Sequence, residues 1–328
     1  MNLKDIRTFL GRDWVETDAL IRSSLRSDIS LLNSTNEEII SNSGKQIRPI
    51  LSLLVARACA SGRTTRDSIR FAAASELLHN ATLLHDDVAD ASEERRGKPT
   101  VMSILGGTAS VLIGDFWLVR AMENILAADA SADRVIRIFS KTLSDLAEGE
   151  MLQLQKADSG DTDEEDYYRI IYSKTASLFE AAAVSAAISV GADESLVEAV
   201  RCFAVSLGLA FQIRDDMFDY YTTEAAIGKP VGIDLEEQKI TMPLLGALSS
   251  VDEDEARLIR DKVVRIHDNP SFKEDIRAFV LEHGGLDYAS AQLDIHVSKA
   301  ISALDLLPDS EEKNFLVETA RYTANRNR

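Results

Sequence analysis

The sequence predicts a large all-α bundle that forms a single domain over residues 1–328. Apolar residues recur with helical periodicity almost from one end of the 328-residue chain to the other. Only 6 Pro and 16 Gly interrupt this pattern, and no proline lies between Pro99 and Pro230. Such a composition suits long helices, because a β architecture needs frequent turns that contain Gly and Pro. No shift in composition marks a domain boundary, and the length allows one large hydrophobic core.

The expected helices follow the apolar periodicity in chain order. They cover residues 2–32, 47–60, 65–88, 108–128, 132–156, 164–191, 194–220, 241–250, 254–267, 271–283, 286–305 and 310–326. The helices over 65–88 and 194–220 are apolar on nearly all sides, so we expect other helices to surround them. Cys59 and Cys202 lie in apolar helical stretches without metal-ligand spacing, so we expect buried thiols in a reducing compartment.

Two groups of aspartates close the two central helices. The stretches HNATLLHDDVAD (79–90) and FQIRDDMFD (211–219) share the spacing D-D-x-x-D. The six residues are Asp86, Asp87, Asp90, Asp215, Asp216 and Asp219. Carboxylates one turn apart repel one another, and the helix dipole disfavours negative charge at a C-terminal end. Because carboxylate oxygens without Cys or paired His suit Mg²⁺, with Mn²⁺ as a substitute, we expect a magnesium site that shares its ion with substrate phosphates.

Basic residues stand in the loops next to these acidic clusters. The loops over 41–49, 91–100 and 222–239 supply most of them, and the helix over 164–191 supplies one more. They are Lys45, Arg48, Arg95, Arg96, Lys174, Lys229 and Lys239. Because phosphate groups are bound through charge-assisted hydrogen bonds, this placement indicates a substrate that carries phosphate.

The overall charge argues against several classes of partner. The chain has 36 Lys and Arg against 54 Asp and Glu, a formal net charge of −18 at pH 7. Nucleic acids and anionic membrane surfaces both need an excess of basic residues, so neither is an expected partner. The sequence shows no signal-like segment and no apolar run that we expect to cross a bilayer. We therefore expect a cytoplasmic protein without an integral membrane segment.

Several segments match one known family in order over residues 44–328. They are GKQIRP, ELLHNATLLHDDVADASEERRGKPT, VLIGDFWLVRAM, EGEMLQLQ, YSKTASLFEAA, FQIRDDMFD, GKPVGIDLEEQKITMPLL and ARYTANRNR. On these segments the chain resembles the trans-polyprenyl diphosphate synthases, and its first aspartate motif is most similar to the octaprenyl and related long-chain branch. The resemblance implies the isoprenoid synthase type of helical bundle, with a central cavity.

The resemblance also implies an activity. The enzyme would be a Mg²⁺-dependent prenyltransferase that condenses isopentenyl diphosphate onto an allylic diphosphate, either farnesyl or geranylgeranyl diphosphate. Its product would be a long-chain all-trans polyprenyl diphosphate, and its partners would be small diphosphate substrates and a second copy of the chain in a homodimer.

Residue roles follow from the same resemblance. Asp86 and Asp90 would hold Mg²⁺ against the allylic diphosphate with Asp87 in support, and Asp215 would hold a further Mg²⁺ from the opposite wall. The implied catalytic residues are Asp86, Asp87, Asp90, Lys174, Asp215, Asp216 and Asp219. Those matching the isopentenyl diphosphate site are Lys45, Arg48, His79 and Arg96. Those matching the allylic diphosphate site are Arg95, Lys174, Thr175, Gln212, Lys229 and Lys239.

Two loops depart from the family pattern, and one helix face bears on product length. Ser43 stands where the family often has a first glycine before its lysine, and Gln238 stands where it often has Glu-Gly-Lys. Both loops lose a permissive glycine but no ligand.

On the helix before Asp86, Ala81 and Thr82 are small where short-chain members carry aromatic rings. These two residues would leave a tunnel open for a growing hydrocarbon, although small residues also serve ordinary helix packing.

Other functions explain fewer of these features. A ferritin-like di-iron protein needs two Glu-x-x-His motifs, and only Glu76-Leu-Leu-His79 is present. A helical HD-type phosphohydrolase could use His85 and Asp86 but needs more histidines near them. A class I terpene cyclase would share the first cluster without the second or the Arg-Arg-Gly element. A non-catalytic partner subunit is the remaining alternative, and such subunits tend to lose the aspartates that are intact here.

Overall fold

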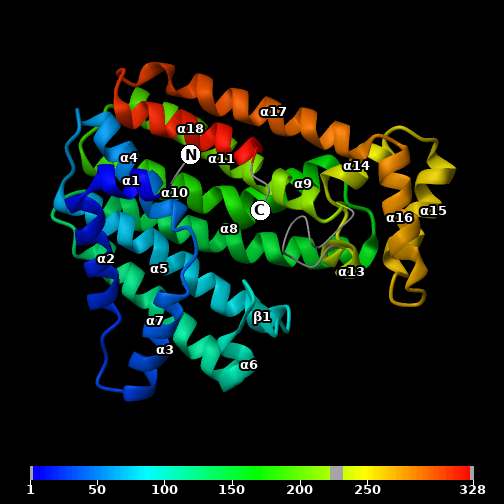
Figure 1. The fold of residues 1–328 in the computed structure, drawn as a ribbon, viewed down its shortest axis with the longest axis horizontal. Coiled ribbons are helices and arrows are strands. Elements are labelled where there is room, and N and C mark those ends of the chain that lie inside the picture. The colour runs from blue at the N-terminus through cyan, green and yellow to red at the C-terminus, as the bar shows by residue number, and fades with distance from the viewer. Residues whose placement is uncertain (1–2, 222–231, 326–328) are drawn as a thin grey trace. The chain divides into compact units, whose positions relative to one another are not determined.

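The computed structural model describes residues 3–221 and 232–325, which are almost wholly helical (Figure 1). The chain divides into two compact units. The first comprises Met1–Ser140, Glu180–Arg201 and Asp305–Leu316, and the second comprises Lys141–Phe179, Cys202–Leu304 and Val317–Arg328. The prediction of an all-α fold is confirmed.

The first unit is built around one long helix. The helices that lie wholly in its first 140 residues are α1 (Leu3–Leu10), α2 (Arg12–Ser24), α3 (Ser30–Ser41), α4 (Ile47–Cys59), α5 (Arg66–Ala89), α6 (Val101–Leu105) and α7 (Gly107–Leu126). Helix α5 packs against α2, α4 and α7, and Figure 1 shows α5 and α7 side by side. Every residue from 71 to 78 of α5 is buried. This burial agrees with the sequence of the segment, which is apolar except for Ser75 and Glu76.

Local chemistry fixes both ends of α5. The Thr65 hydroxyl accepts a hydrogen bond from the Ser68 N–H, and the Ser68 hydroxyl accepts one from the Thr65 N–H, which forms a capping box. At the other end Asp90 is the C-cap, and Ala91 turns the chain with a φ of 48°. The first aspartate cluster therefore lies in the last turn of α5.

A short hairpin follows α5. Strands β1 (Glu94–Arg95) and β2 (Lys98–Pro99) pair antiparallel, with Arg95 opposite Lys98. The two turn residues, Arg96 and Gly97, have φ values of 57° and 73°. Positive φ at both positions is the geometry of a tight hairpin turn, and glycine adopts it without steric cost. The sequence prediction had this segment as a loop, so the hairpin is a correction.

The middle of the chain contains a π-helical turn, η1 (Tyr172–Ala176), between two α-helices. The elements in this part are, in order, α8 (Ala132–Ser159), α9 (Glu164–Ile171), η1, α10 (Ser177–Ser189) and α11 (Glu194–Phe218). A Cβ on Gly149 of α8 would lie 2.4 Å from the Cβ of Ser173, and a Cβ on Gly208 of α11 would lie 2.5 Å from the Cα of Ala176. Both helices therefore approach η1 so closely that a side chain at either glycine position would clash with it.

The last part of the chain forms shorter helices. They are α13 (Ile233–Glu236), α14 (Met242–Leu248), α15 (Glu253–Val264), α16 (Ser271–Glu282), α17 (Gly285–Ala303), the 3-10 turn η2 (Leu304–Leu306) and α18 (Glu311–Asn325). Helix α14 packs on α17, and α15 lies beside α16 (Figure 1). The predicted helices over 241–326 match these to within a few residues, whereas α6 and α13 were not predicted.

The N-terminal prediction of one helix over 2–32 is wrong. The chain instead forms α1 and α2, which Gly11 separates with a φ of 52°, and then α3, which continues to residue 41. Between α2 and α3, Asn33 donates to the Ser27 carbonyl at 2.6 Å and accepts from the Ser27 N–H at 2.9 Å. This side-chain turn competes with the helix, and apolar periodicity alone does not reveal it.

The two cysteines are less buried than we expected. Cys202 is exposed and Cys59 is half-buried, so neither is a fully buried thiol, although burial raises the pKa of Cys59 to about 11.

One helix also differs from the sequence expectation about membrane spans. Among the described residues, α11 is long and apolar enough to cross a bilayer. Its apolar window is 56% buried inside the protein, which is also how a core helix behaves.

Candidate active site

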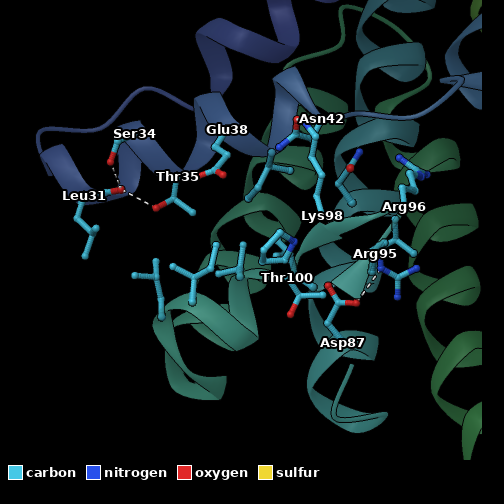
Figure 2. A pocket seen from close by; sticks show the side chains of 18 residues that line it. Leu31, Ser34, Thr35, Glu38, Asn42, Asp87, Arg95, Arg96, Lys98 and Thr100 are labelled. Carbon is cyan, nitrogen blue, oxygen red and sulfur yellow. Dashed lines mark hydrogen bonds and ion pairs between the residues drawn. The ribbon is translucent and has the colours of Figure 1, made fainter. Parts of the chain in front are cut away.

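The three aspartates of the first cluster differ in their surroundings. Asp86 is half-buried, Asp87 is buried and Asp90 is exposed. The Arg95 Nε donates to Asp87 Oδ1 at 2.7 Å, and Figure 2 shows this contact from the hairpin. Burial raises the pKa of Asp87, and the charge of Arg95 opposes that rise. Asp87 is thus engaged by the protein itself, which fits a supporting role beside Asp86 and Asp90.

A cavity of about 270 Å³ opens beside this cluster, between α3, α5, the hairpin and α6 (Figure 2). Its charged lining residues are Glu38, Asp87, Arg95, Arg96 and Lys98, and the rest of the lining mixes aliphatic with uncharged polar side chains. Lys98 donates to Asn42 Oδ1 across the cavity. Ala81 and Thr82 are not among its lining residues. The cavity therefore lies on a different face of α5 from the one predicted to border the product tunnel.

Three of the residues predicted to bind isopentenyl diphosphate, Arg48, His79 and Arg96, lie together in the first unit. Burial lowers the pKa of His79 well below the usual value, and the charges of Arg48 and Arg96 lower it further, so its ring is neutral at pH 7. Burial lowers the pKa of Arg48 to about 10, and the nearby carboxyl of Glu76 opposes this. Glu76 is 4% exposed and accepts from Asn80 Nδ2 at 3.2 Å. Sequence reasoning assigned Glu76 no part in this group.

Two contacts hold the loop that carries Lys45. Arg7 of α1 donates to the Lys45 carbonyl at 2.9 Å and to Gln46 Oε1 at 3.3 Å. A Cβ on Gly44 would lie 2.5 Å from the Arg96 guanidinium, so that side chain packs directly on the glycine and would have to shift for a larger residue. Arg7 was missed because it lies 38 residues from Lys45 and outside every recognised motif.

The fragments that suggested other enzyme classes have different environments. Glu76 and His79 lie among the cations Arg48 and Arg96, which is an unsuitable setting for two ferrous ions. His85 Nε2 lies 3.3 Å from Asp115 Oδ1 and 3.3 Å from the Val111 carbonyl oxygen on α7. No group of three or more His, Cys, Asp or Glu side chains within 3–221 and 232–325 could by itself hold a metal ion. Mg²⁺ still fits the aspartates, because it keeps several waters and needs only one or two protein carboxylates besides phosphate.

The second aspartate cluster lies at the end of α11, and its members also differ. Tyr167 OH donates to Asp216 Oδ2 at 2.6 Å, and Gln212 Nε2 donates to Asp216 Oδ1 at 2.8 Å. Burial raises the pKa of Asp216 to about 7, against the effect of both hydrogen bonds. Asp215 is half-buried on the neighbouring position. The protein therefore engages both oxygens of Asp216.

Asp219 has a third kind of environment. Its Oδ1 accepts from the Gly232 N–H at 2.8 Å and the Ile233 N–H at 3.0 Å, and its Oδ2 accepts from the Asp234 N–H at 3.0 Å. These N–H groups begin α13, which has no other cap. Asp234 is itself half-buried, and desolvation together with the charges of Asp216 and Asp219 raises its pKa well above the usual value. Sequence reasoning did not single out Asp234.

The residues predicted to bind the allylic diphosphate gather partly on η1. Lys174 forms an ion pair with Glu150 at 2.7 Å, and Thr175 Oγ1 donates to Gln212 Oε1 at 2.7 Å. A pocket of about 100 Å³ in the second unit is lined by Lys174, Gln212, Asp216, Asp234 and Lys239, among others. Lys239 also pairs with Glu237. Arg95 lies in the first unit, and Lys229 lies outside the described residues.

The loop before Lys239 shows why a glycine is common there. Gln238 has a φ of 58°, in the left-handed region that glycine adopts without steric cost. Its side-chain amide donates to the Val264 carbonyl, which ties the loop to the end of α15. The loop therefore keeps the conformation that a glycine would permit, with glutamine in its place.

The predicted chain-length residues lie on α5. Ala81 is 1% exposed and Thr82 is half-buried. A Cβ on Gly114 of α7 would lie 3.2 Å from the Ala81 carbonyl oxygen, so α5 and α7 approach closely at this level. The Thr82 hydroxyl donates to the His79 carbonyl at 2.9 Å.

Comparisons with known proteins give one consistent picture. A family model described as polyprenyl synthetase matches residues 29–279. An octaprenyl diphosphate synthase from Haemophilus influenzae is 38% identical over 327 residues, which cover 100% of this chain and 98% of that protein. A crystal structure of a decaprenyl diphosphate synthase from Rhodobacter capsulatus has a TM-score of 0.91 at 35% identity and covers 100% of both chains. A polyprenyl synthase from Caulobacter crescentus, complexed with calcium and isoprenyl diphosphate, has a TM-score of 0.90 at 32% identity, over 100% of this chain and 98% of that one.

Proposed function

The chain belongs to the polyprenyl synthetase family, and we propose that it condenses isopentenyl diphosphate onto an allylic diphosphate to make a long-chain all-trans polyprenyl diphosphate. One observation carries the proposal. Two D-D-x-x-D motifs end α5 and α11 in a chain that is 38% identical over its whole length to an octaprenyl diphosphate synthase. We propose farnesyl or geranylgeranyl diphosphate as the primer.

The metal of this reaction would be Mg²⁺, with Mn²⁺ as a substitute. Its proposed ligands are Asp86, Asp90 and Asp215, the residues that the family resemblance assigns to the metal. Asp87, which Arg95 engages, and Asp216 and Asp219, which accept hydrogen bonds from protein donors, would support them. When bound, a divalent cation neutralises the charge that develops on a diphosphate leaving group. The calcium and isoprenyl diphosphate in the Caulobacter enzyme support a hard cation beside diphosphate in this fold.

The remaining residues would bind and orient the two substrates. Lys45, Arg48 and Arg96 would hold the diphosphate of isopentenyl diphosphate, and neutral His79 would donate one hydrogen bond to it. For the allylic diphosphate we propose Arg95, Lys174, Thr175, Gln212, Lys229 and Lys239. In the absence of substrate Glu150 pairs with Lys174, so binding would exchange that carboxylate for phosphate oxygens. Such exchange keeps the lysine charge compensated at each stage.

We propose that residues 1–328 act as one catalytic domain and pair as a homodimer. The polyprenyl synthetase match spans parts of both compact units, which supports the single domain. Helix α7 exposes Leu112, Val119 and Leu126 by 63%, 53% and 60%, and their spacing of seven residues places them along one face. A second copy would cover this apolar row. Val119→Glu should give a monomer by light scattering. The control Leu258→Glu, at an exposed position of α15, should leave the dimer intact.

A product assay tests the activity directly. The purified protein is incubated with Mg²⁺, labelled isopentenyl diphosphate and farnesyl diphosphate, and the dephosphorylated products are sized. A ladder that ends at long chains supports the proposal, and a parallel run with geranylgeranyl diphosphate ranks the primers. Absence of any condensation with either primer, from folded dimeric protein, would overturn it.

A further inference from the structure

Tyr167 is a buried tyrosine whose hydroxyl has one acceptor. Its ring lies in α9, is 2% exposed, and packs against Tyr168 with ring centroids 5.8 Å apart. The hydroxyl donates to Asp216 Oδ2 at 2.6 Å. This distance is at the short end for O–H···O bonds, as expected when the acceptor is a carboxylate. Burial is also the main reason why the pKa of Tyr167 is raised well above its usual value, so the phenol keeps its proton and remains a donor.

The hydrogen bond begins a chain that crosses three helical segments. Asp216 accepts on its other oxygen from Gln212 Nε2 at 2.8 Å, and Gln212 Oε1 accepts from Thr175 Oγ1 at 2.7 Å. Because the Gln212 nitrogen faces a carboxylate, its oxygen must face Thr175. The Thr175 hydroxyl therefore donates its proton to Gln212, and its oxygen can accept a hydrogen bond only from another donor. One buried hydroxyl on α9 thus determines the orientation of groups on α11 and η1.

The groups at the end of this chain belong to the proposed binding site. Gln212 and Asp216 line the pocket of about 100 Å³ together with Lys174 and Lys239, and Tyr167 forms part of its wall. Tyr167 itself lies among side chains and presents its hydroxyl only to Asp216 among the described residues. We propose that Tyr167 is a positioning residue: its hydroxyl orients Asp216, Gln212 and Thr175 for the allylic diphosphate and its metal. This inference rests on the proposed function and adds a residue to it.

Removal of the hydroxyl has a specific consequence. In Tyr167→Phe the ring still fills its space, but Asp216 Oδ2 becomes a buried carboxylate oxygen without its donor. Asp216 must then turn toward another donor or take up a proton, and Gln212 loses its fixed orientation. We expect binding of farnesyl diphosphate in the presence of Mg²⁺ to weaken by about tenfold, which corresponds to about 1.4 kcal/mol. The KM for isopentenyl diphosphate should change less than about twofold, because its proposed ligands lie in the first unit.

The neighbouring tyrosine provides a matched control. Tyr168 OH donates to Gln292 Oε1 at 3.2 Å and lies 3.2 Å from His296 Nε2, so it takes no part in the chain to Asp216. Tyr168→Phe removes the same atom one residue away. Calorimetric titration of farnesyl diphosphate with Mg²⁺ into wild type, Tyr167→Phe and Tyr168→Phe, without isopentenyl diphosphate, should show weakened binding in Tyr167→Phe alone.

A double-mutant cycle separates positioning from a general loss of stability. Thr175→Val removes the other end of the chain, and the losses of allylic affinity in Tyr167→Phe and Thr175→Val should be non-additive when combined. Strictly additive losses, or equal affinity in Tyr167→Phe and Tyr168→Phe, would overturn the positioning role. A wild-type protein that condenses no isopentenyl diphosphate would instead overturn the proposed function, so the two failures are distinguishable.

Discussion

The carboxylate of Asp219 receives the backbone N–H of Gly232 at 2.8 Å, together with those of Ile233 and Asp234. The third aspartate of a motif that reads as a metal site is therefore a cap for the first turn of α13. By contrast, Asp216, three residues earlier in the same motif, is held by the side chains of Tyr167 and Gln212. Identical residues in one motif thus have separate tasks, and mutations should separate them.

Asp219→Ala should lower stability more than chemistry. Three N–H groups would lose their acceptor, so we expect the free energy of unfolding to fall by about 1–2 kcal/mol, the range measured for helix caps. Asp219→Asn keeps one acceptor oxygen and should lose less. Urea denaturation in EDTA measures both. An unchanged midpoint combined with a raised Mg²⁺ requirement would assign Asp219 to the metal instead.

Asp86→Ala and Asp215→Ala should behave in the opposite way. Each proposed ligand stabilises charge on the leaving diphosphate, so kcat should fall by at least about 10²-fold. Stability should not fall in parallel, because removal of a repelling carboxylate relieves unfavourable charge at a helix end. Wild-type activity should vanish in EDTA and return with Mg²⁺, without a specific need for Zn²⁺. Full activity in the chelator would exclude a metal role for both clusters.

Arg96→Ala and Lys174→Ala should separate the two substrates. Arg96 packs over Gly44 beside Arg48 and His79, so its loss should mainly raise the KM for isopentenyl diphosphate. Lys174 lies on η1 beside Thr175, so its loss should mainly raise the KM for the allylic substrate. Initial rates with each substrate varied in turn provide the measurement. If both variants affected the same substrate, the assignment of the two diphosphate sites would be wrong.

The pKa of Asp216 predicts a pH dependence of stability. In the folded protein it is raised to about 7 from an ordinary 3.8, so the folded state holds a proton that the unfolded state has lost. Stability from this group is therefore complete below about pH 4 and is lost as the pH rises toward 7, by about 1.4 kcal/mol per pH unit at most. In EDTA, the difference in unfolding free energy between Asp216→Asn and wild type should grow from pH 5 to pH 8. A constant difference would show that Asp216 is already ionised at pH 5.

Sequence reasoning recovered the elements whose signals are local. Apolar periodicity predicted a helix over 65–88, close to the observed α5 (Arg66–Ala89), and the aspartate spacing identified both clusters. It failed where a distant residue decides the outcome. Nothing near Asp87 indicates whether Arg95 or Arg96 will pair with it, and that choice depends on a hairpin turn with two positive φ values.

The same limit explains the missed site residues. Arg7 reaches the Lys45 loop from 38 positions away, and Tyr167 reaches Asp216 from 49. Neither contact leaves a periodic or motif signal. Glu76 offered one clue, because a charged residue inside a buried, mostly apolar helical stretch needs a partner, and its partners are the cations Arg48 and Arg96. A search for buried charges within apolar segments would have identified it.

Ala81→Phe tests the proposed control of product length. Ala81 lies five residues before Asp86, about one helical turn below the proposed metal site, and is 1% exposed at the level where α5 meets α7. A phenyl ring there would fill space that only a growing product needs, if the side chain borders the tunnel. The first condensations should then proceed with Mg²⁺, while longer chains are disfavoured by overpacking of about 1–3 kcal/mol. Products sized after dephosphorylation should shift to about three or four isoprene units, with a smaller shift for Thr82→Phe. Unchanged product lengths would place Ala81 in helix packing alone, and a fall in melting temperature with loss of all activity would point to the close approach of α5 and Gly114.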